Sequence, residues 1–182
     1  MSDSIDLAKH RFELQQLETA IKTMLALNCE LLSRSPETPI DSLVVQLEAD
    51  QKGRSRLASL LFSPLQETDI ETLKLLQFYC ETPIQVSSPS ARQAVAELLS
   101  AINLNLPIGT FCLNANHTLT YKYVYALGKF TTIVPEEFLE TFLLWLFALD
   151  PMSNLIESVA NGEQSLTSAL ALLQSDSGSA TR

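Results

Sequence analysis

The segment from Thr118 to Leu127 constrains the fold of this chain more than any other part of the sequence. Its side chains alternate strictly, with three tyrosines, Tyr121, Tyr123 and Tyr125, on one face and Thr120, Lys122 and Val124 on the other. A two-residue period is typical of a β-strand, because successive side chains of a strand point to opposite faces. The sequence therefore predicts a strand with one aromatic face.

Turn residues predict two β-hairpins. The aromatic strand follows a strand at 110–113 across the turn at 114–117, and a strand at 42–50 precedes another at 57–62 across the turn at 51–54. The segment 73–84 fits either a short helix or a buried strand. Its aromatic residues and the closing Thr82-Pro83 favour a strand.

Helical periodicity appears in the remaining segments. Apolar residues recur at three- and four-residue steps from Ile5 to Leu32, which predicts one long helix. His10 and Asn28 fall on that stripe, and a helix packed on its own sheet is favoured over a register-setting position in a helix pair. Two further helices begin at prolines, one after Ser88 and one at Pro135, and weaker helices are expected at 154–160 and 166–173.

This order predicts an α+β fold. We expect an antiparallel sheet of about five strands with helices on one face (α-βββ-α-ββ-α), plus a C-terminal helical extension from about residue 151. A chain of 182 residues fits a single domain, here residues 1–174. Residues 175–182, rich in serine and glycine, are expected to form a disordered tail.

The composition restricts the partners. A net charge of −9 and a pI near 4.6 disfavour nucleic acid and anionic membrane surfaces. The longest strongly apolar run, 142–149, is shorter than a membrane span, and the N-terminus lacks the pattern of a signal peptide. Three separated cysteines among apolar neighbours indicate free thiols in a reducing compartment, so a cytoplasmic location is expected.

No catalytic residue, metal site or cofactor site is predicted. The two histidines, His10 and His117, lack companions at metal-ligand spacing, and the five glycines are too far apart to form a phosphate-binding loop. Lys52, Arg54 and Arg56 form a basic cluster, for which a solvated hairpin tip is favoured over a phosphate site. The sequence therefore predicts a protein that is not an enzyme.

The helix at 136–149 carries more apolar surface than one contact with a sheet requires. From Phe142 onward it is apolar on every side, whereas a helix that covers a sheet needs only a stripe. Either the C-terminal extension covers the excess, or a second copy does in a homodimer, which we expect. The candidate partner or dimer surface consists of Tyr121, Tyr123, Tyr125, Phe142, Trp145, Leu146 and Leu149.

One family resemblance rests on short motifs. The helix 94–102, the following run Asn105-Leu106-Pro107-Ile108-Gly109-Thr110-Phe111 and the aromatic strand 121–127 resemble the YbjN family and the wider type III secretion chaperone-like fold, over about residues 5–160. The resemblance implies a dimer-forming, non-enzymatic protein, and for secretion chaperones it implies binding of an extended, partly apolar client segment. The motif residues are structural, so no functional residue carries over. The polar tip at 51–54, the hydrophobic helix and the C-terminal extension depart from the pattern and leave the client class open.

Two functions follow from these observations. The first is a chaperone-like adaptor or assembly factor that binds a segment of a client protein, because apolar surface is plentiful and reaction chemistry is missing. The alternative is a small-molecule sensor or enzyme with a pocket between the sheet and the helix at 136–149. Since the net charge is −9, a client carrying lysine or arginine beside its apolar anchors is expected to associate faster.

Overall fold

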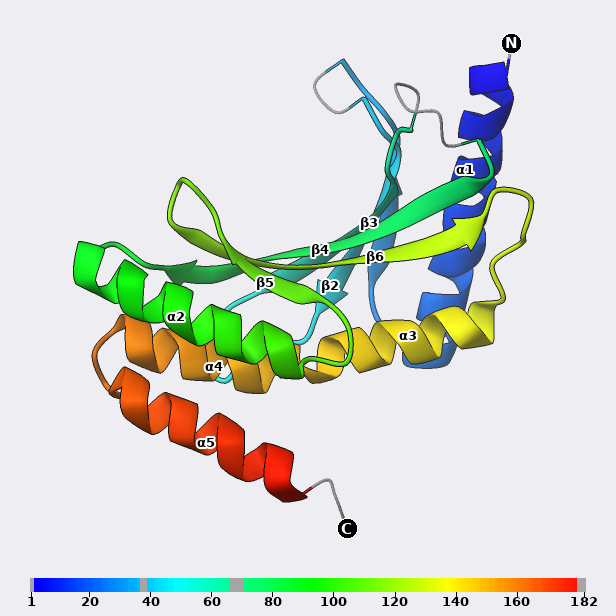
Figure 1. The fold of residues 1–182 in the computed structure, drawn as a ribbon. Coiled ribbons are helices and arrows are strands. Elements are labelled where there is room, and N and C mark those ends of the chain that lie inside the picture. Colours follow the sequence, from blue (N-terminus) through cyan, green and yellow to red (C-terminus); the bar gives the residue numbers. More distant parts are fainter. Residues whose placement is uncertain (1, 37–38, 66–70, 180–182) are drawn as a thin grey trace. The chain divides into compact units, whose positions relative to one another are not determined.

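The computed structural model describes residues 2–36, 39–65 and 71–179, and the side chains within 6–36, 39–65 and 71–175. The elements are, in chain order, α1 (Ser2–Ala20), a π-helical turn η1 (Ile21–Leu25), β1 (Cys29–Leu32), β2 (Ser42–Leu47), β3 (Arg56–Phe62), β4 (Leu73–Gln85), α2 (Pro89–Asn105), β5 (Thr110–Leu113), β6 (Thr118–Gly128), α3 (Pro135–Phe147), α4 (Leu149–Ala160) and α5 (Leu166–Ser179). Figure 1 labels the α-helices and the strands from β2 onward.

The predicted α+β class is confirmed, with a six-stranded antiparallel sheet in the order β1-β2-β3-β4-β6-β5. Both hairpins form, and the ambiguous segment is the long strand β4. The sixth strand is β1, which lies where the sequence predicted the end of the first helix. That helix instead ends in a π-helical turn followed by Ala26 in the left-handed conformation, with φ 54°, and the chain then pairs Leu31 with Leu43 of β2.

The contacts of the chain group it into two compact units, each built from two segments. The first unit comprises residues 1–80 and 123–143, and the second comprises 81–122 and 144–182. The boundaries fall inside β4, β6 and α3, which are continuous elements. The single domain over residues 1–174 stays a prediction.

In the first unit, strand register places the apolar residues of three strands on one face. Leu43 pairs with Leu60, and Leu60 pairs with Phe78, so these side chains point the same way. The same alternation adds Val45, Ala58, Phe62, Leu76 and Cys80, and all of these residues are buried. The face is therefore continuous across β2, β3 and β4.

Helices α1 and α3 cover this face. Helix α1 contacts β1, β2 and β3 and buries Leu14 and Leu17. From α3, the rings of Phe138 and Phe142 meet the edge of Phe78, with centroids 5.7 Å and 6.0 Å away. The expectation that the first helix packs on the protein's own sheet is thus confirmed.

In the second unit, the turn at 106–109 leads from α2 into β5. Its last residue, Gly109, adopts a conformation that requires glycine. Ser88 caps α2 by accepting a hydrogen bond from the Ala91 backbone N–H at 3.1 Å. At the other end, Gly109 has φ +82°, and a Cβ there would lie 2.6 Å from the Tyr121 hydroxyl oxygen. The glycine is therefore required both by backbone conformation and by the aromatic ring against it.

The C-terminal helices pack on α2 and correct two expectations. Helix α4 begins at Leu149, five residues before the predicted start at 154, and Pro151 lies in its first turn, where its missing N–H costs no hydrogen bond. Helix α5 extends to Ser179 and so includes the first five residues of the predicted tail, 175–179, and residues 180–182 lie outside the described residues.

Within the described residues, one helical stretch, 135–160, could cross a membrane when judged by its length and apolar composition alone. The structure divides this stretch into α3 and α4 at Ala148. Phe142, Trp145, Leu149 and Ile156 of the stretch are buried in the folded chain, whereas Leu143, Leu144 and Phe147 are exposed.

Candidate binding cleft

A cleft of about 590 Å³ lies in the first unit. One wall is a single face of α1, because residues three and four apart lie together on a helix surface. The opposite side comes from the start of β4 and from the loop after β6. The lining residues used below are Asp6, Lys9, His10, Phe12, Glu13, Lys74, Lys129, Phe130 and Thr131.

The inner part of the cleft holds a buried ion pair between Lys74 and Glu13. Lys74 has the same strand parity as Leu76 and Phe78, so alternation directs its side chain to the helix-covered face, where it is 4% exposed. Its ammonium donates to Glu13 Oε1 and, at 2.6 Å, to the backbone carbonyl of Thr131. The pair thereby ties β4 to α1 and to the loop after β6.

The second carboxylate oxygen of Glu13 is not satisfied. Oε2 is buried and has no hydrogen-bond partner in the described part of the chain. An unpaired buried charge-bearing oxygen is costly, so the Lys74 ammonium carries most of the compensation for this carboxylate.

A second ion pair, between Lys129 and Asp6, also lines the cleft. Lys129 Nζ lies 2.8 Å from Asp6 Oδ2, and both side chains are partly exposed. The hydrogen bond from Lys129 lowers the pKa of Asp6, so this carboxylate is ionised at neutral pH. The backbone N–H of Lys129 also donates to the Thr72 carbonyl at 2.8 Å, which fixes the start of the loop beside β4.

His10 lies flat on Phe62, with ring centroids 4.1 Å apart and an interplanar angle of 13°. Burial lowers the pKa of His10, and the Lys74 ammonium lowers it further. The imidazole is therefore neutral at pH 7 and contributes packing rather than charge.

The rim of the cleft is aromatic and exposed. Phe130 is 84% exposed and Phe12 is 59% exposed, and the Lys9 ammonium lies 6.0 Å from the centroid of the Phe130 ring. Large apolar side chains at such exposure beside a cleft are typical of recognition surfaces. The arrangement supplies apolar contact, hydrogen bonding and charge, and no activated nucleophile is among its residues.

The residues predicted to form a partner or dimer surface do not line the cleft. Four of them, Tyr121, Phe142, Trp145 and Leu149, are buried in the core, with Tyr121 stacked between Phe111 and Trp145 at centroid distances of 4.2 Å and 5.1 Å. A partner cannot contact these four side chains on the folded chain. Tyr123, Tyr125 and Leu146 are half-buried, and for these three a role in a partner or dimer surface stays a prediction.

The aromatic residues also fill the space proposed for a small-molecule pocket between the sheet and the helix. In the first unit Phe138 and Phe142 of α3 pack on Phe78 of β4, and in the second unit Trp145 stacks on Tyr121. Tyr121 and Trp145, two of the residues expected to line such a pocket, are thus packed against each other.

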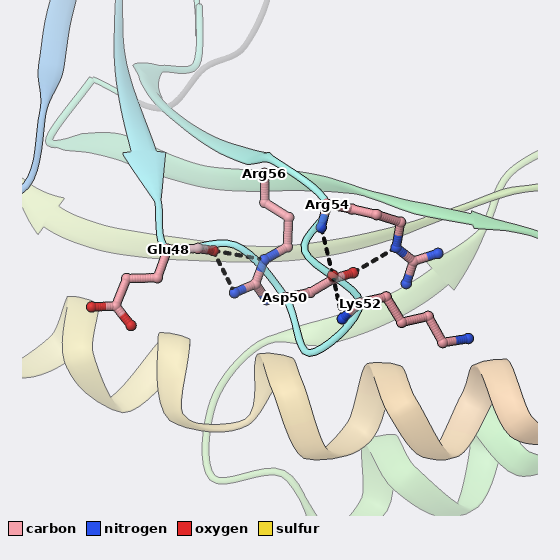
Figure 2. A network of polar contacts seen from close by, with 5 residues as sticks. All are labelled: Glu48, Asp50, Lys52, Arg54 and Arg56. Carbon is pink, nitrogen blue, oxygen red and sulfur yellow. Dashed lines mark hydrogen bonds and ion pairs between the residues drawn. The ribbon is translucent and has the colours of Figure 1, made fainter.

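The basic cluster at the β2–β3 hairpin holds the turn together (Figure 2). Asp50 accepts hydrogen bonds from the backbone N–H groups of Lys52 and Arg54 and from Arg54 Nε, at 2.9, 2.8 and 2.7 Å. Burial alone would raise the pKa of Asp50, but these hydrogen bonds outweigh it and the pKa is lowered. Arg56 is buried rather than solvated, and its guanidinium donates to the Glu48 carbonyl at 2.8 Å and 3.2 Å. The Arg54 and Arg56 side chains therefore contact a carboxylate and a backbone carbonyl, respectively, within the hairpin.

Sequence reasoning missed the cleft. The sequence pattern predicts only that Lys74 belongs to a strand. A lysine on the apolar face of a buried strand nevertheless indicates that a carboxylate lies against it, because a buried charge needs a partner. Phe130 carried no periodic signal, because it lies in a loop. Within the described residues, no group of three or more histidine, cysteine, aspartate or glutamate side chains could hold a metal ion.

The chain thus has an α+β fold, and its first unit holds a cleft lined by ion pairs and exposed aromatic rings. Residues 45–154 match the model of the YbjN family, described as "Putative bacterial sensory transduction regulator", and the chain belongs to this family. The resemblance to the YbjN family found from the sequence motifs is thereby confirmed. The match includes Lys74 and the loop at 129–132, whereas α1 lies before it. No curated protein matches the chain.

Proposed function

We propose that this chain is a non-enzymatic regulatory module that binds a segment of a client protein in the cleft between α1 and the loop after β6. The observation that carries the proposal is the pair of exposed rings, Phe12 and Phe130, at the rim of a cleft whose inner part is a buried ion pair. The family description as a regulator supports a binding role. An apolar anchor of a client would cover the two rings, and burial of one phenylalanine side chain contributes about 1.5–3 kcal/mol.

Site-specific photo-crosslinking tests the proposal. The photoreactive residue p-benzoylphenylalanine replaces Phe130 in the full chain, and adducts formed in cells are identified by mass spectrometry. The matched control carries the same residue at Leu57, which is also in the first unit, is 53% exposed and does not line the cleft. We expect adducts at position 130 that map to a linear segment of a partner. Equal adduct yields at both positions would refute the assignment of the cleft.

The size of the cleft supports a second candidate function, the sensing of a small molecule. A volume of about 590 Å³ falls within the range of about 300–1,000 Å³ that small-molecule sites occupy. A thermal-shift screen against metabolites separates the two candidates, because a ligand that binds only the folded chain raises its melting temperature. A shift that is lost in the Phe130→Ser variant would favour the small molecule.

A further inference from the structure

We infer that the cleft selects an acidic client segment, one that carries aspartate or glutamate beside an aromatic or aliphatic anchor. This inference rests on the proposed function and specifies the chemistry of the client. It reverses the expectation from net charge alone, by which a client would be basic.

The local charge of the cleft is opposite to that of the chain. Among the described residues, three lysines and two carboxylates line it, and His10 is neutral at pH 7 because burial lowers its pKa, so this lining carries one net positive charge. The whole chain carries −9. A quarter of the twelve lysine and arginine residues of the chain thus gather around one cleft.

The positive charge is concentrated at Lys9. The other two lysines are paired within the cleft, Lys74 with Glu13 and Lys129 with Asp6. Lys9 makes no ion pair among the residues that the structure describes, and its ammonium lies beside the exposed Phe130 ring. A cation next to an exposed aromatic ring matches a carboxylate next to an apolar anchor.

A basic client would meet unfavourable contacts at the same place. Lysine or arginine beside the anchor would approach Lys9, Asp6 and Glu13 Oε1 are already paired with lysines, and the unpaired Oε2 of Glu13 is buried. Like charges at a contact suppress the wrong partner. The overall negative charge slows the approach of an acidic segment at low salt, so added salt should speed its association.

Peptide display tests this chemistry without a known client. A library of short random peptides is selected on the full chain and counter-selected against Phe130→Ser, so that only peptides that require the rim are retained. We expect the retained peptides to be enriched in aspartate or glutamate next to an apolar residue. The affinity of the best peptide is then measured by fluorescence anisotropy.

Two charge-reversal variants complete the test. Lys9→Glu should weaken binding about tenfold, because the exchange replaces an attraction with a repulsion of similar size. Lys122→Glu is the matched control: it changes the net charge equally at an exposed position on β6 outside the cleft and should change affinity less than about twofold. Far-UV circular dichroism checks that both variants are folded.

The outcomes separate the inference from the proposed function. Peptides that require Phe130 but are basic or neutral, or that bind Lys9→Glu as well as the unmodified chain, would overturn the acidic-client inference and leave the binding module standing. If no retained peptide distinguishes the chain from Phe130→Ser, the proposed cleft fails, and the inference fails with it.

Discussion

Removal of the Lys74 ammonium should be among the most damaging single changes to the first unit. Lys74 is 4% exposed and Glu13 is 11% exposed in their side chains, so both charges are largely withdrawn from water. Lys74→Met retains an unbranched aliphatic side chain but removes the ion-pair partner of the Glu13 carboxylate. Neither carboxylate oxygen would then be paired with a lysine, because Oε2 has no hydrogen-bond partner among the described residues of the unmodified chain. Breaking a buried pair by removing one partner costs about 3–5 kcal/mol.

The reverse change should cost less. In Glu13→Leu the Lys74 ammonium still donates to the Thr131 carbonyl at 2.6 Å and lies 5.8 Å from the centroid of the Phe62 ring. Part of the compensation therefore survives, and we expect a loss near the lower end of the same range, about 3 kcal/mol. The double variant leaves no buried charge, so it should be close to the unmodified chain in stability or exceed it.

Urea unfolding followed by far-UV circular dichroism measures these differences. With a denaturant slope of about 2 kcal/mol per molar, a loss of about 4 kcal/mol moves the midpoint by about 2 M. Lys22→Met is the matched control, because Lys22 of η1 forms an exposed ion pair with Glu18 of α1, and its midpoint should not move. A double variant as unstable as Lys74→Met, or a Lys74→Met midpoint equal to that of the control, would refute the reasoning.

Four further predictions use other parts of the structure. Gly109→Ala should lower stability by more than about 1 kcal/mol in chemical denaturation, because φ is +82° and the new methyl group would meet the Tyr121 ring. Burial raises the pKa of Tyr121, so its stabilising effect is complete below the unfolded pKa of about 10 and is lost as pH rises through the folded pKa; a Tyr121→Phe variant should lose less stability above pH 10. Burial lowers the pKa of His10, so stability should fall as pH drops below about 6.5 towards the folded pKa, and thermal melts of His10→Gln should lack that part of the decline. We also propose that exposed apolar residues of α3 in the second unit, Leu144 and Phe147, mediate the predicted homodimer, and light scattering should find a dimer that Phe147→Glu dissociates; a monomer of the unmodified chain at micromolar concentration would contradict this.

The unfolding experiments also address the number of domains. Trp145 is the only tryptophan in the sequence and belongs to the second unit, whereas the Lys74 variants perturb the first. If the chain is one cooperative domain, tryptophan fluorescence and circular dichroism will give coincident transitions. Separate transitions would mean that the two units unfold independently.

Local patterns determined most of the secondary structure of this protein. The alternation through Tyr121, Tyr123 and Tyr125 sufficed for β6, because no other element has a two-residue period. Ser88 and Pro135 marked the starts of α2 and α3, since capping and the fixed φ of proline act within one turn. These signals depend on neighbouring residues and need no knowledge of the rest of the chain.

Tertiary contacts, and not local sequence patterns, determine that residues 29–32 form a strand, which faces of the elements are buried, and which residues meet in the cleft. Cys29–Leu32 continues the helical spacing of the residues before it, and its pairing with β2, a contact between residues ten or more positions apart, makes it a strand. The pattern that placed Tyr121 on a face could not show that Phe111 and Trp145 enclose it. Glu13, Lys74 and Phe130 come from a helix, a strand and a loop that are distant in sequence, and no local pattern shows that they lie together. Their chemistry arises from packing, because burial and charge pairing depend on which segments the fold brings together.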